Sequence, residues 1–404
     1  MRTWMTTHCH KIPDASKYVG DRSNTYALLR KEIDEYFEDS AKLEEELKDV
    51  RKFKRDFKSY DGANYDTYNC PDKPPIGYPF TWKTTAIVEK WPADDIDPPS
   101  FIENDGNQVF LHHNSLCIFD YQRDSYKAIA YREARLPFIV DNDPAVLKTV
   151  ARWNSPNYMN RLLGDLPHRT ELSLTNNFLF HAPPRHPKSS KLRTMKETEG
   201  SHRPTKLVRM TFANWLRKAK SRLTSPKDPH WYFRLISCGK TAPDGSCDVN
   251  ASEFLFDELP FFQPKFDSLY LVDPNKQRGI HCRFGMPGVT AQNHYDFGRN
   301  AIALLQGTRR YILSHPDQCK NMALFPPGHP SARHSAIDWA DPNLEEYPEF
   351  SQAQSHEVVL QAGQVLYLPH VWFHHIISLD INMQCNTRSG IDHELQEYID
   401  DCGF

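Results

Sequence analysis

The second half of the chain is a series of short apolar runs, each followed by turn residues. Between residue 231 and the C-terminus these runs include SLYLV, HCRFG, AIALL, RYILS, HEVVL, QVLYLP and HHIISL. Runs of this length, broken by Gly, Pro and Asn, are typical of antiparallel strands. The chain also contains 30 prolines in 404 residues, which disfavours an all-helical protein because proline interrupts helices. We therefore expect a mainly β fold with added helices (α+β), built as an antiparallel sandwich or barrel.

The N-terminal part of the chain has a different pattern. Residues 23–60 are dense in charge, and their apolar residues recur at helical spacing without an intervening Pro or Gly. This predicts one or two amphipathic helices that lie on a domain, with a dimerisation helix as the alternative. Residues 61–105 are rich in Pro, Asp and aromatic residues and predict irregular coil. We interpret residues 1–105 as an N-terminal extension and residues 106–404 as the main domain.

The middle of the chain adds strands, helices and an insert. Residues 108–140 have strand-like patterns, and helical patterns follow at 144–150 and 155–163. Residues 183–206 are polar and basic, which is typical of a flexible loop. A short strand and a basic helix capped by Thr211 come next. A solvated face is the simpler interpretation of this basic region, and contact with an acidic or nucleic-acid partner is the alternative.

Charge and cysteine content restrict the class of protein. The formal net charge is −3, which gives no whole-molecule case for binding nucleic acid or an anionic membrane. The nine cysteines are odd in number and form no CxxC pair, so we expect free thiols in a reducing compartment instead of disulfides or structural zinc. No apolar run resembles a signal peptide or a membrane span, which predicts an intracellular protein, cytoplasmic or nuclear.

One polar stretch inside the β region has the spacing of metal ligands. In VTAQNHYDFGRN, His294 and Asp296 are two residues apart, so in a strand their side chains point to the same face. Such a pair supplies two ligands of the 2-His-1-carboxylate site that binds Fe(II). The stretch LQAGQVLYLPHVWFHHIISLD offers a third ligand from His370, His374 or His375. His374 and His375 face opposite sides of a strand, and the residues alone do not choose among the three.

Two segments resemble a known family. GMPGVTAQNHYDFGRNAIALLQGTRRYILSHPDQ and SHEVVLQAGQVLYLPHVWFHHIISL, with ALFPPGHPSARHSAIDWADPNLEEYPEF between them, resemble JmjC-type oxygenases of the cupin-like branch. They are most similar to the asparaginyl hydroxylases that act on hypoxia-inducible factor, over residues 130–390. The resemblance implies a double-stranded β-helix, or jelly roll. In this family the metal histidine follows a Trp–aromatic pair, here Trp372–Phe373, and this selects His374.

The resemblance also implies the cofactor Fe(II), bound by His294, Asp296 and His374, and the co-substrate 2-oxoglutarate. A basic residue past the Gly that follows the His-x-Asp strand binds the far carboxylate of 2-oxoglutarate. Here that residue is Arg309, where lysine is commoner, and arginine can pair with a carboxylate through two hydrogen bonds. We expect Arg310 to be an ordinary surface charge. The resemblance implies three further contacts to the co-substrate, from Asn300, Tyr232 and Asn386. A threonine that the family has before the His-x-Asp pair falls near Thr290 or Ala291.

The ligand set predicts a dioxygenase that converts 2-oxoglutarate to succinate and CO2 while it hydroxylates a C–H bond. A protein or peptide side chain is the favoured target, because no histone-reader motif accompanies the catalytic region. N-demethylation of a methylated lysine and action on a nucleic-acid base, contacted through the basic insert, are alternatives. A non-catalytic cupin-fold binding module ranks last because the ligands and the co-substrate cation are all present. The sequence is compatible with a homo-oligomer.

Overall fold

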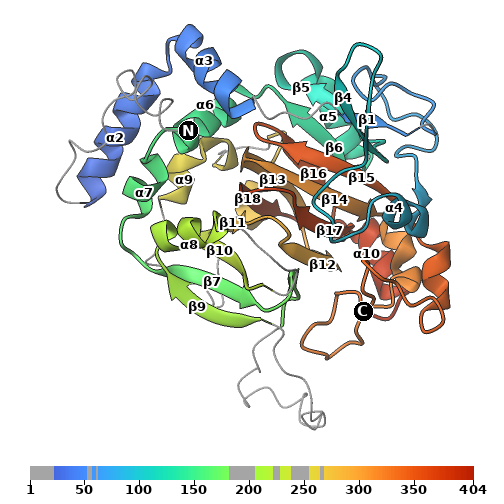
Figure 1. Ribbon diagram of the computed structural model, residues 1–404. Coiled ribbons are helices and arrows are strands. Elements are labelled where there is room, and N and C mark those ends of the chain that lie inside the picture. Colours follow the sequence, from blue (N-terminus) through green and yellow to red (C-terminus); the bar gives the residue numbers. More distant parts are fainter. Residues whose placement is uncertain are drawn as a thin grey trace.

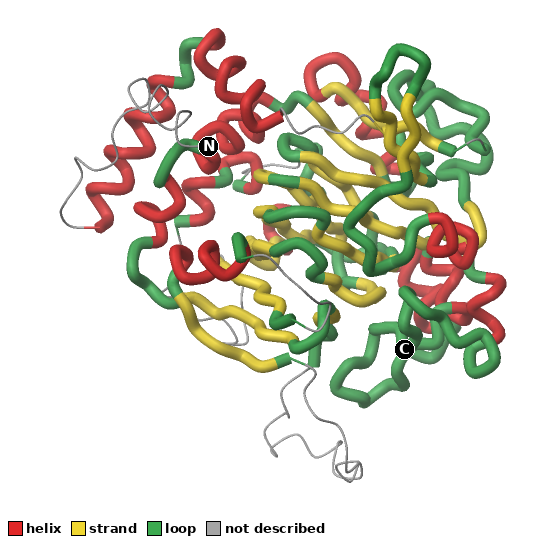
Figure 2. Tube along the Cα trace, in the orientation of Figure 1, coloured by secondary structure: helices red, strands yellow, loops and turns green. Residues whose placement is uncertain are grey.

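The computed structural model describes residues 22–51, 57–60, 62–181, 205–221, 228–237, 254–263 and 268–404 (Figure 1). The predicted basic insert at 183–206 lies outside the described residues except for its last two positions. Strands occupy the centre of the molecule, and helices lie around them, as the tube in Figure 2 shows.

Two sheets form the body of the protein. The larger has nine strands in the order β5-β6-β16-β13-β18-β11-β10-β7-β9, and the smaller has six in the order β2-β15-β14-β17-β12-β8. In these orders, the nine strands are Ile118–Asp120, Phe138–Asp141, Val365–Leu368, Arg299–Gln306, Asn382–Ser389, Gln277–Gly285, His230–Ser237, His168–Ser173 and Lys206–Met210. The six are Trp82–Lys83, Gln354–Gln361, Thr308–Ser314, Phe373–Ser378, Thr290–Tyr295 and Asn177–Phe178.

Most strand pairs are antiparallel, and side chains of the two sheets meet in one core. Every residue of β14, β16 and β17 is buried. Strands covered on both faces do not need to alternate apolar with polar residues, which explains the continuous apolar runs of the sequence. The predicted jelly roll of the cupin type, with helices added, is confirmed.

Helices cover the outer faces of the sheets. On the larger sheet, α6 (Pro144–Asn154) packs on β13, α8 (Phe212–Ala219) on β10, and α5 (Tyr121–Glu133) on β5 and β6. The cap of α6 is Asp143, which accepts a hydrogen bond from the amide of Ala145, and Thr211 caps α8 as predicted. Further α-helices of the body are α4 (Thr84–Lys90), α7 (Tyr158–Leu163), α9 (Leu255–Glu258) and α10 (His393–Asp400).

The two charged N-terminal helices, α2 (Arg22–Tyr36) and α3 (Ser40–Arg51), lie against α6 (Figure 1). Their apolar stripes are buried there, so they are used within the molecule, as the packing interpretation expects; the buried residues are Leu29, Ile33, Phe37 and Leu47. The predicted coil of residues 61–105 contains α4, β2 and β3 (Ser100–Ile102). Strand β2 pairs with β15, and β3 pairs with β4 (Gln108–His112), which also pairs with β1 (Phe57–Ser59).

The prediction of free thiols is wrong. Every cysteine in the part of the chain that the structure describes forms a disulfide: Cys70–Cys117, Cys282–Cys385 and Cys319–Cys402. The partners are 47, 103 and 83 residues apart, so neither the odd count nor the lack of CxxC could indicate them. The argument for a reducing compartment therefore loses its basis. Among the described residues, no helix combines the length and the apolar character needed to cross a membrane.

The expectation for Arg310 is also wrong. Its side chain points away from that of Arg309, because consecutive residues of a strand face opposite sides, but it is fully buried. Its Nε donates to Glu357 Oε2 at 2.6 Å, its terminal nitrogens donate to the carbonyls of Trp91 and Pro92, and the guanidinium lies 4.0 Å from the Trp91 ring centre. The N-terminal segment around α4 covers this face of β14, so Arg310 is part of an internal ion pair.

Candidate metal centre

Neighbouring strands of the smaller sheet bring three predicted residues together. His294 is on β12, Asp296 follows the end of that strand, and His374 is on β17. His294 and His374 are directly opposite each other in the antiparallel register of β12 and β17. One ligand atom from each of the three residues lies within 4.8 Å of the others, which is close enough to share an ion.

The fold distinguishes the three candidate histidines. His374 faces the interior with His294, whereas His375 points to the other face of β17, where its ring stacks on Trp339 at 5.0 Å. His370 lies before the strand, and its Nδ1 accepts a hydrogen bond from the amide of Gly298. Only His374 therefore joins the pair on β12.

Backbone carbonyls orient both imidazoles. His294 Nδ1 lies 2.7 Å from the carbonyl oxygen of Gln292, and His374 Nδ1 lies 3.0 Å from that of Trp372. A carbonyl only accepts, so Nδ1 carries the proton in both rings and Nε2 keeps its lone pair. Hydrogen bonds of this kind are what hold metal-ligating histidines in position.

The protonation states match those of metal ligands. Burial lowers the pKa of His294 and of His374, which keeps both rings neutral. Burial alone would raise the pKa of Asp296, but Arg388, the two histidines and Arg333 together hold that pKa well below its usual range. Neutral imidazoles and an ionised carboxylate are the forms that bind a metal, and two nitrogens with one oxygen fit the 2-His-1-carboxylate pattern.

Three residues around this centre were missed by the sequence reasoning. Arg388 Nη1 donates to Asp296 Oδ1 at 2.8 Å, while Asp296 Oδ2 lies 3.9 Å from His374 Nε2. Arg333 lies 3.7 Å from Asp296, and the ring of His334 stacks on His294 at 4.8 Å. The strand period could have predicted Arg388, because it is two residues past Asn386 on β18 and so shares its face. Arg333 and His334 lie in a loop, where no sequence pattern indicates them.

Arg309 lies in the interior between the two sheets. The turn before it needs Gly307, whose φ is +71° and where an added Cβ would lie 2.4 Å from the carbonyl oxygen of Ile381. The fully buried guanidinium donates to Asn382 Oδ1 at 2.5 Å, to Gln384 Oε1 and to the carbonyl oxygen of Arg283. All three acceptors are uncharged, and no acidic partner of Arg309 occurs among the described residues.

The other predicted co-substrate residues lie in the same interior. The ring of Tyr232 is 5.6 Å from the Arg309 guanidinium carbon. Gln384, which accepts from Arg309, donates to Asn386 Oδ1 at 3.4 Å, and Asn386 donates to Asn300 Oδ1 at 2.8 Å. A chain of contacts thus connects all four residues.

The structure also decides the register before the His-x-Asp pair. A bulge in β12 between Ala291 and His294 shifts the alternation of side chains between the two faces of the strand. As a result, Ala291 is opposite Ile376 and Thr290 is opposite Ile377. Ile376 and His374 share a face of β17, which places Ala291 on the side of the metal ligands. The hydroxyl of the family's threonine is therefore missing at this position.

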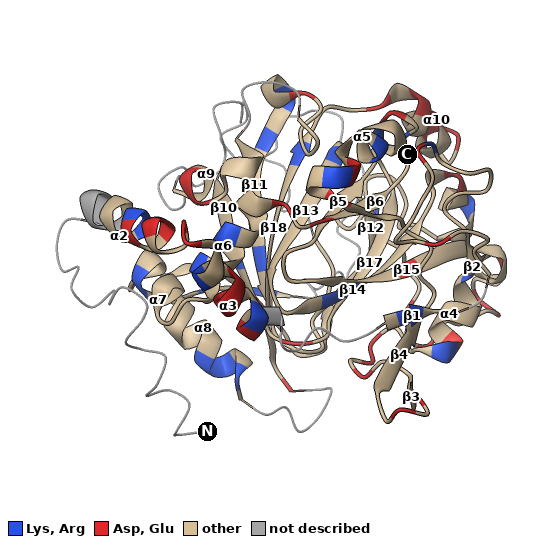
Figure 3. Cartoon of the chain, turned by 90° about the horizontal axis from the view of Figure 1, so that it is seen from above, with Lys and Arg blue, Asp and Glu red and all other residues tan. Residues whose placement is uncertain are grey.

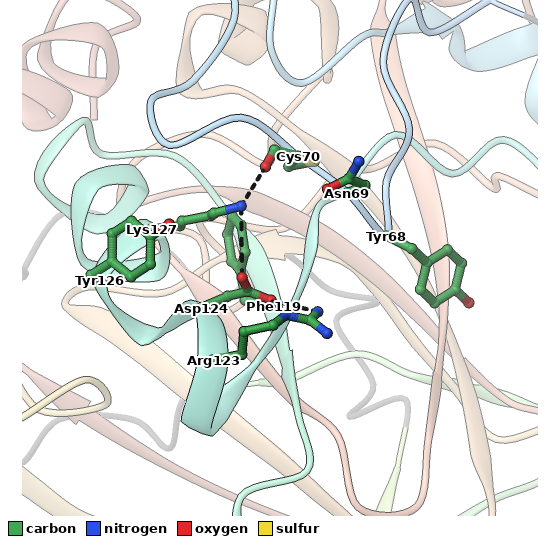
Figure 4. A pocket seen from close by; sticks show the side chains of 8 residues that line it. All are labelled: Tyr68, Asn69, Cys70, Phe119, Arg123, Asp124, Tyr126 and Lys127. Atoms are coloured by element: carbon green, nitrogen blue, oxygen red, sulfur yellow. Dashed lines mark hydrogen bonds and ion pairs between the residues drawn. The ribbon is translucent and has the colours of Figure 1, made fainter.

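A cavity of about 270 Å³ lies elsewhere, beside α5 (Figure 4). Its two cations face Asp124, with Arg123 Nη2 at 2.7 Å and Lys127 Nζ at 3.6 Å from that carboxylate. Because Asp124 pairs with both cations of the cavity, we assign it no role.

Comparison with known proteins gives one family match. The model of the cupin-like domain matches residues 127–387. The chain is 28% identical to tRNA wybutosine-synthesizing protein 5 of Danio rerio over 163 residues. This stretch covers 40% of this chain and 45% of that protein. It is 30% identical to lysine-specific demethylase JMJ31 of Arabidopsis thaliana over 28% of this chain and 21% of the relative. It is 33% identical to HSPB1-associated protein 1 of Homo sapiens over 24% of this chain and 23% of that protein. The chain thus spans less than half the length of these relatives.

Proposed function

Because this chain belongs to the family of cupin-like domains of JmjC type, we propose that it is an Fe(II)- and 2-oxoglutarate-dependent oxygenase. The observation that carries the proposal is the convergence of His294, Asp296 and His374, with their ligand atoms within 4.8 Å of one another. These three residues would hold iron(II). With 2-oxoglutarate and O2, iron(II) supplies hydroxylation of a C–H bond, and succinate and CO2 are the co-products.

The residues of the chain have separate tasks in this proposal. The carbonyls of Gln292 and Trp372 keep the ligand nitrogens of the two histidines directed inward, and Arg388 holds one oxygen of Asp296 so that the other is left for the metal. The buried Arg309 would bind the far carboxylate of 2-oxoglutarate, because a charged partner replaces neutral acceptors where water is excluded. Tyr232, Asn300 and Asn386 would line the same compartment.

The prime substrate of this proposal is a macromolecule. The names of the relatives point to tRNA in one case and to lysine in another. From the sequence alone, hydroxylation of a protein side chain is the favoured reaction, and N-demethylation and action on a nucleic-acid base are the alternatives. The proposal also includes the predicted domain division, with the catalytic domain at residues 106–404 and an N-terminal extension at residues 1–105.

An intracellular location is a further part of the proposal, and the disulfides provide its test. Thiols are alkylated in intact cells before lysis, and the state of Cys70 and Cys319 is read by mass spectrometry. Alkylated cysteines agree with a cytoplasmic or nuclear site, whereas intact disulfides indicate an oxidising compartment.

The chemistry is tested by measuring succinate formed from 2-oxoglutarate with added Fe(II), together with binding of 2-oxoglutarate. We expect metal-dependent turnover in the wild type and its loss in His294→Ala. His393→Ala, at an exposed histidine of α10, is the matched control and should keep full turnover. A wild type that neither binds nor consumes 2-oxoglutarate contradicts the proposal and favours a binding module.

A further inference from the structure

Four arginines form a row across four adjacent strands of the larger sheet. Arg209 on β9 is directly opposite Arg169 on β7, and Arg234 on β10 is directly opposite Arg283 on β11. The register of β7 and β10 pairs Thr170 with Phe233, so Arg169 and Arg234 come together at the next position. These strands lie side by side, from the edge of the sheet toward its centre (Figure 1). Neighbouring strands are about 4.8 Å apart, so the row is roughly 14 Å long.

Like charges placed directly opposite each other destabilise a sheet. The carboxylate of Glu171 lies 3.2 Å from Arg169 and 2.6 Å from Arg234, so these two arginines share one acidic residue. Arg283 has no ion pair among the described residues, and its Nη1 donates to the neutral Asn386. The three positive charges of Arg169, Arg234 and Arg283 thus share one carboxylate, an arrangement that costs stability, as expected of a site that binds an anion.

Three guanidinium groups in this region carry a buried donor with no partner in the described structure. These donors are the Nε–H groups of Arg169, Arg234 and Arg388. An unpaired buried donor costs free energy, so it indicates a missing acceptor. Arg283 donates to Asn386 of β18 at 3.1 Å, and Arg388, two residues further along β18, donates to Asp296 at 2.8 Å, so the row continues to the metal centre.

Exposure falls along the row from its outer end to the metal centre. Arg209 is exposed, the side chain of Arg169 is 37% exposed and that of Arg234 is 12% exposed. A chain of negative charges could therefore begin binding at the surface and continue inward. A single carboxylate of a small co-substrate would not need four guanidinium groups.

An aromatic stack reaches the same centre. The exposed ring of Phe180 stacks on His334 at 6.4 Å and 23°, and His334 stacks on the metal-site residue His294 at 4.8 Å and 11°. Flat rings of this kind are platforms for nucleobases, which present a π-face regardless of sequence. Guanidinium groups beside stacking rings are the combination that binds single-stranded nucleic acid.

We propose that the row Arg209–Arg169–Arg234–Arg283 binds the phosphates of a single-stranded RNA segment and directs one of its nucleotides to the metal centre. This inference rests on the proposed oxygenase function and specifies its substrate class. An acidic peptide matches the cations but has no use for the stack that begins at Phe180, so RNA is the better match.

Binding of a fluorescein-labelled, mixed-sequence single-stranded RNA, measured by anisotropy without 2-oxoglutarate, tests the proposal. The double variant Arg169→Ala/Arg209→Ala should weaken binding at least tenfold. It should also reduce the slope of log affinity against log salt by about 1.4, because each lost phosphate contact on a single strand contributes about 0.7. Phe180→Ala should weaken binding without changing that slope.

The matched control is Arg217→Ala, an exposed arginine on α8, which packs on the other face of the same sheet through Phe212 and Phe233. It should bind RNA like the wild type. Equal losses in the control and the double variant, no loss in the double variant, or polyglutamate bound as tightly as RNA would each overturn the proposal. Failure of RNA binding with intact 2-oxoglutarate turnover overturns this inference alone, whereas absent 2-oxoglutarate binding overturns the oxygenase.

Discussion

Arg309 and Arg310 are neighbours in the sequence, and both are fully buried, but on opposite faces of β14. Arg310 pairs with Glu357, whose pKa is about 2: burial would raise that pKa, and Arg310 and His113 outweigh burial. Arg309 has neutral acceptors only. At the scale of the residue, the same side chain is thus structural in one position and available for a ligand in the next.

This contrast gives a matched pair of variants. Arg309→Met should raise the KM for 2-oxoglutarate by about tenfold or more, because the buried carboxylate loses its charge partner. Arg310→Met should leave that KM unchanged and lower the free energy of unfolding by about 3–5 kcal/mol, because Glu357 is left buried and unpaired. Succinate kinetics and urea unfolding measure the two effects. An unchanged KM in Arg309→Met would show that the far carboxylate binds elsewhere.

At the scale of the element, Glu258 joins α9 to α6 and α7. Its buried carboxylate accepts hydrogen bonds from Arg152 Nε at 3.1 Å, Trp153 Nε1 at 3.0 Å and Tyr158 OH at 2.8 Å. Arg152 also reaches Asp34 of α2 at 2.5 Å, so this cluster fixes the N-terminal helices to the body of the protein.

Glu258→Ala should lower the free energy of unfolding by about 3–5 kcal/mol, because three buried donors, one of them the guanidinium of Arg152, lose their acceptor. Urea denaturation followed by circular dichroism measures this loss. The matched control is Asp257→Ala, which removes the exposed carboxylate of the preceding residue on the same helix and should change stability little. A loss below about 1 kcal/mol in Glu258→Ala would mean that the cluster adds little.

The C-terminal helix α10 is attached by a disulfide. Cys402, just past α10, pairs with Cys319 in the short helix Pro316–Asn321, 83 residues earlier. Cys402→Ser should lower the free energy of unfolding by about 2–5 kcal/mol, since the unfolded chain gains freedom. Thermal unfolding with and without dithiothreitol measures it, and the reductant should shift the variant less than the wild type. Equal shifts would indicate that this disulfide does not contribute.

At the scale of the whole molecule, charge is distributed unevenly although the net charge is small. Figure 3 shows basic residues on α8 and acidic residues on α10.

Buried histidines are also spread through the fold. Burial lowers the pKa of His356 and of His375 to about 3 and that of His112 and of His168 to about 4.

These histidines predict acid sensitivity. In the unfolded chain each has a pKa of about 6.5, so below that pH the unfolded state binds more protons and the folded state loses stability. Each histidine contributes up to about 1.4 kcal/mol per pH unit between about pH 6.5 and its folded pKa. Urea unfolding at about pH 7.5, 6 and 5 should show falling stability, with a smaller fall in His356→Leu. A fall as steep in that variant as in the wild type would contradict the assignment.

Local rules were sufficient for several features that depend on nearby residues, but the strand-like pattern assigned to residues 108–140 missed the helix α5 (Tyr121–Glu133). The β period placed His294 and Asp296 on one face, the helix signals placed α6 and the Thr211 cap, and the apolar runs predicted the sandwich. The choice of His374 needed a family resemblance, because a strand pattern does not say which of two consecutive histidines faces inward.

The tertiary structure alone decided the rest. The disulfides, the burial of Arg310, the bulge that turns Ala291 inward and the arginine row all depend on which distant segments become neighbours. The sequence by itself determined the periodicity of the strands and the chemistry of the metal ligands. Strand order and register determined their partners, because side chains meet across strands that are far apart along the chain.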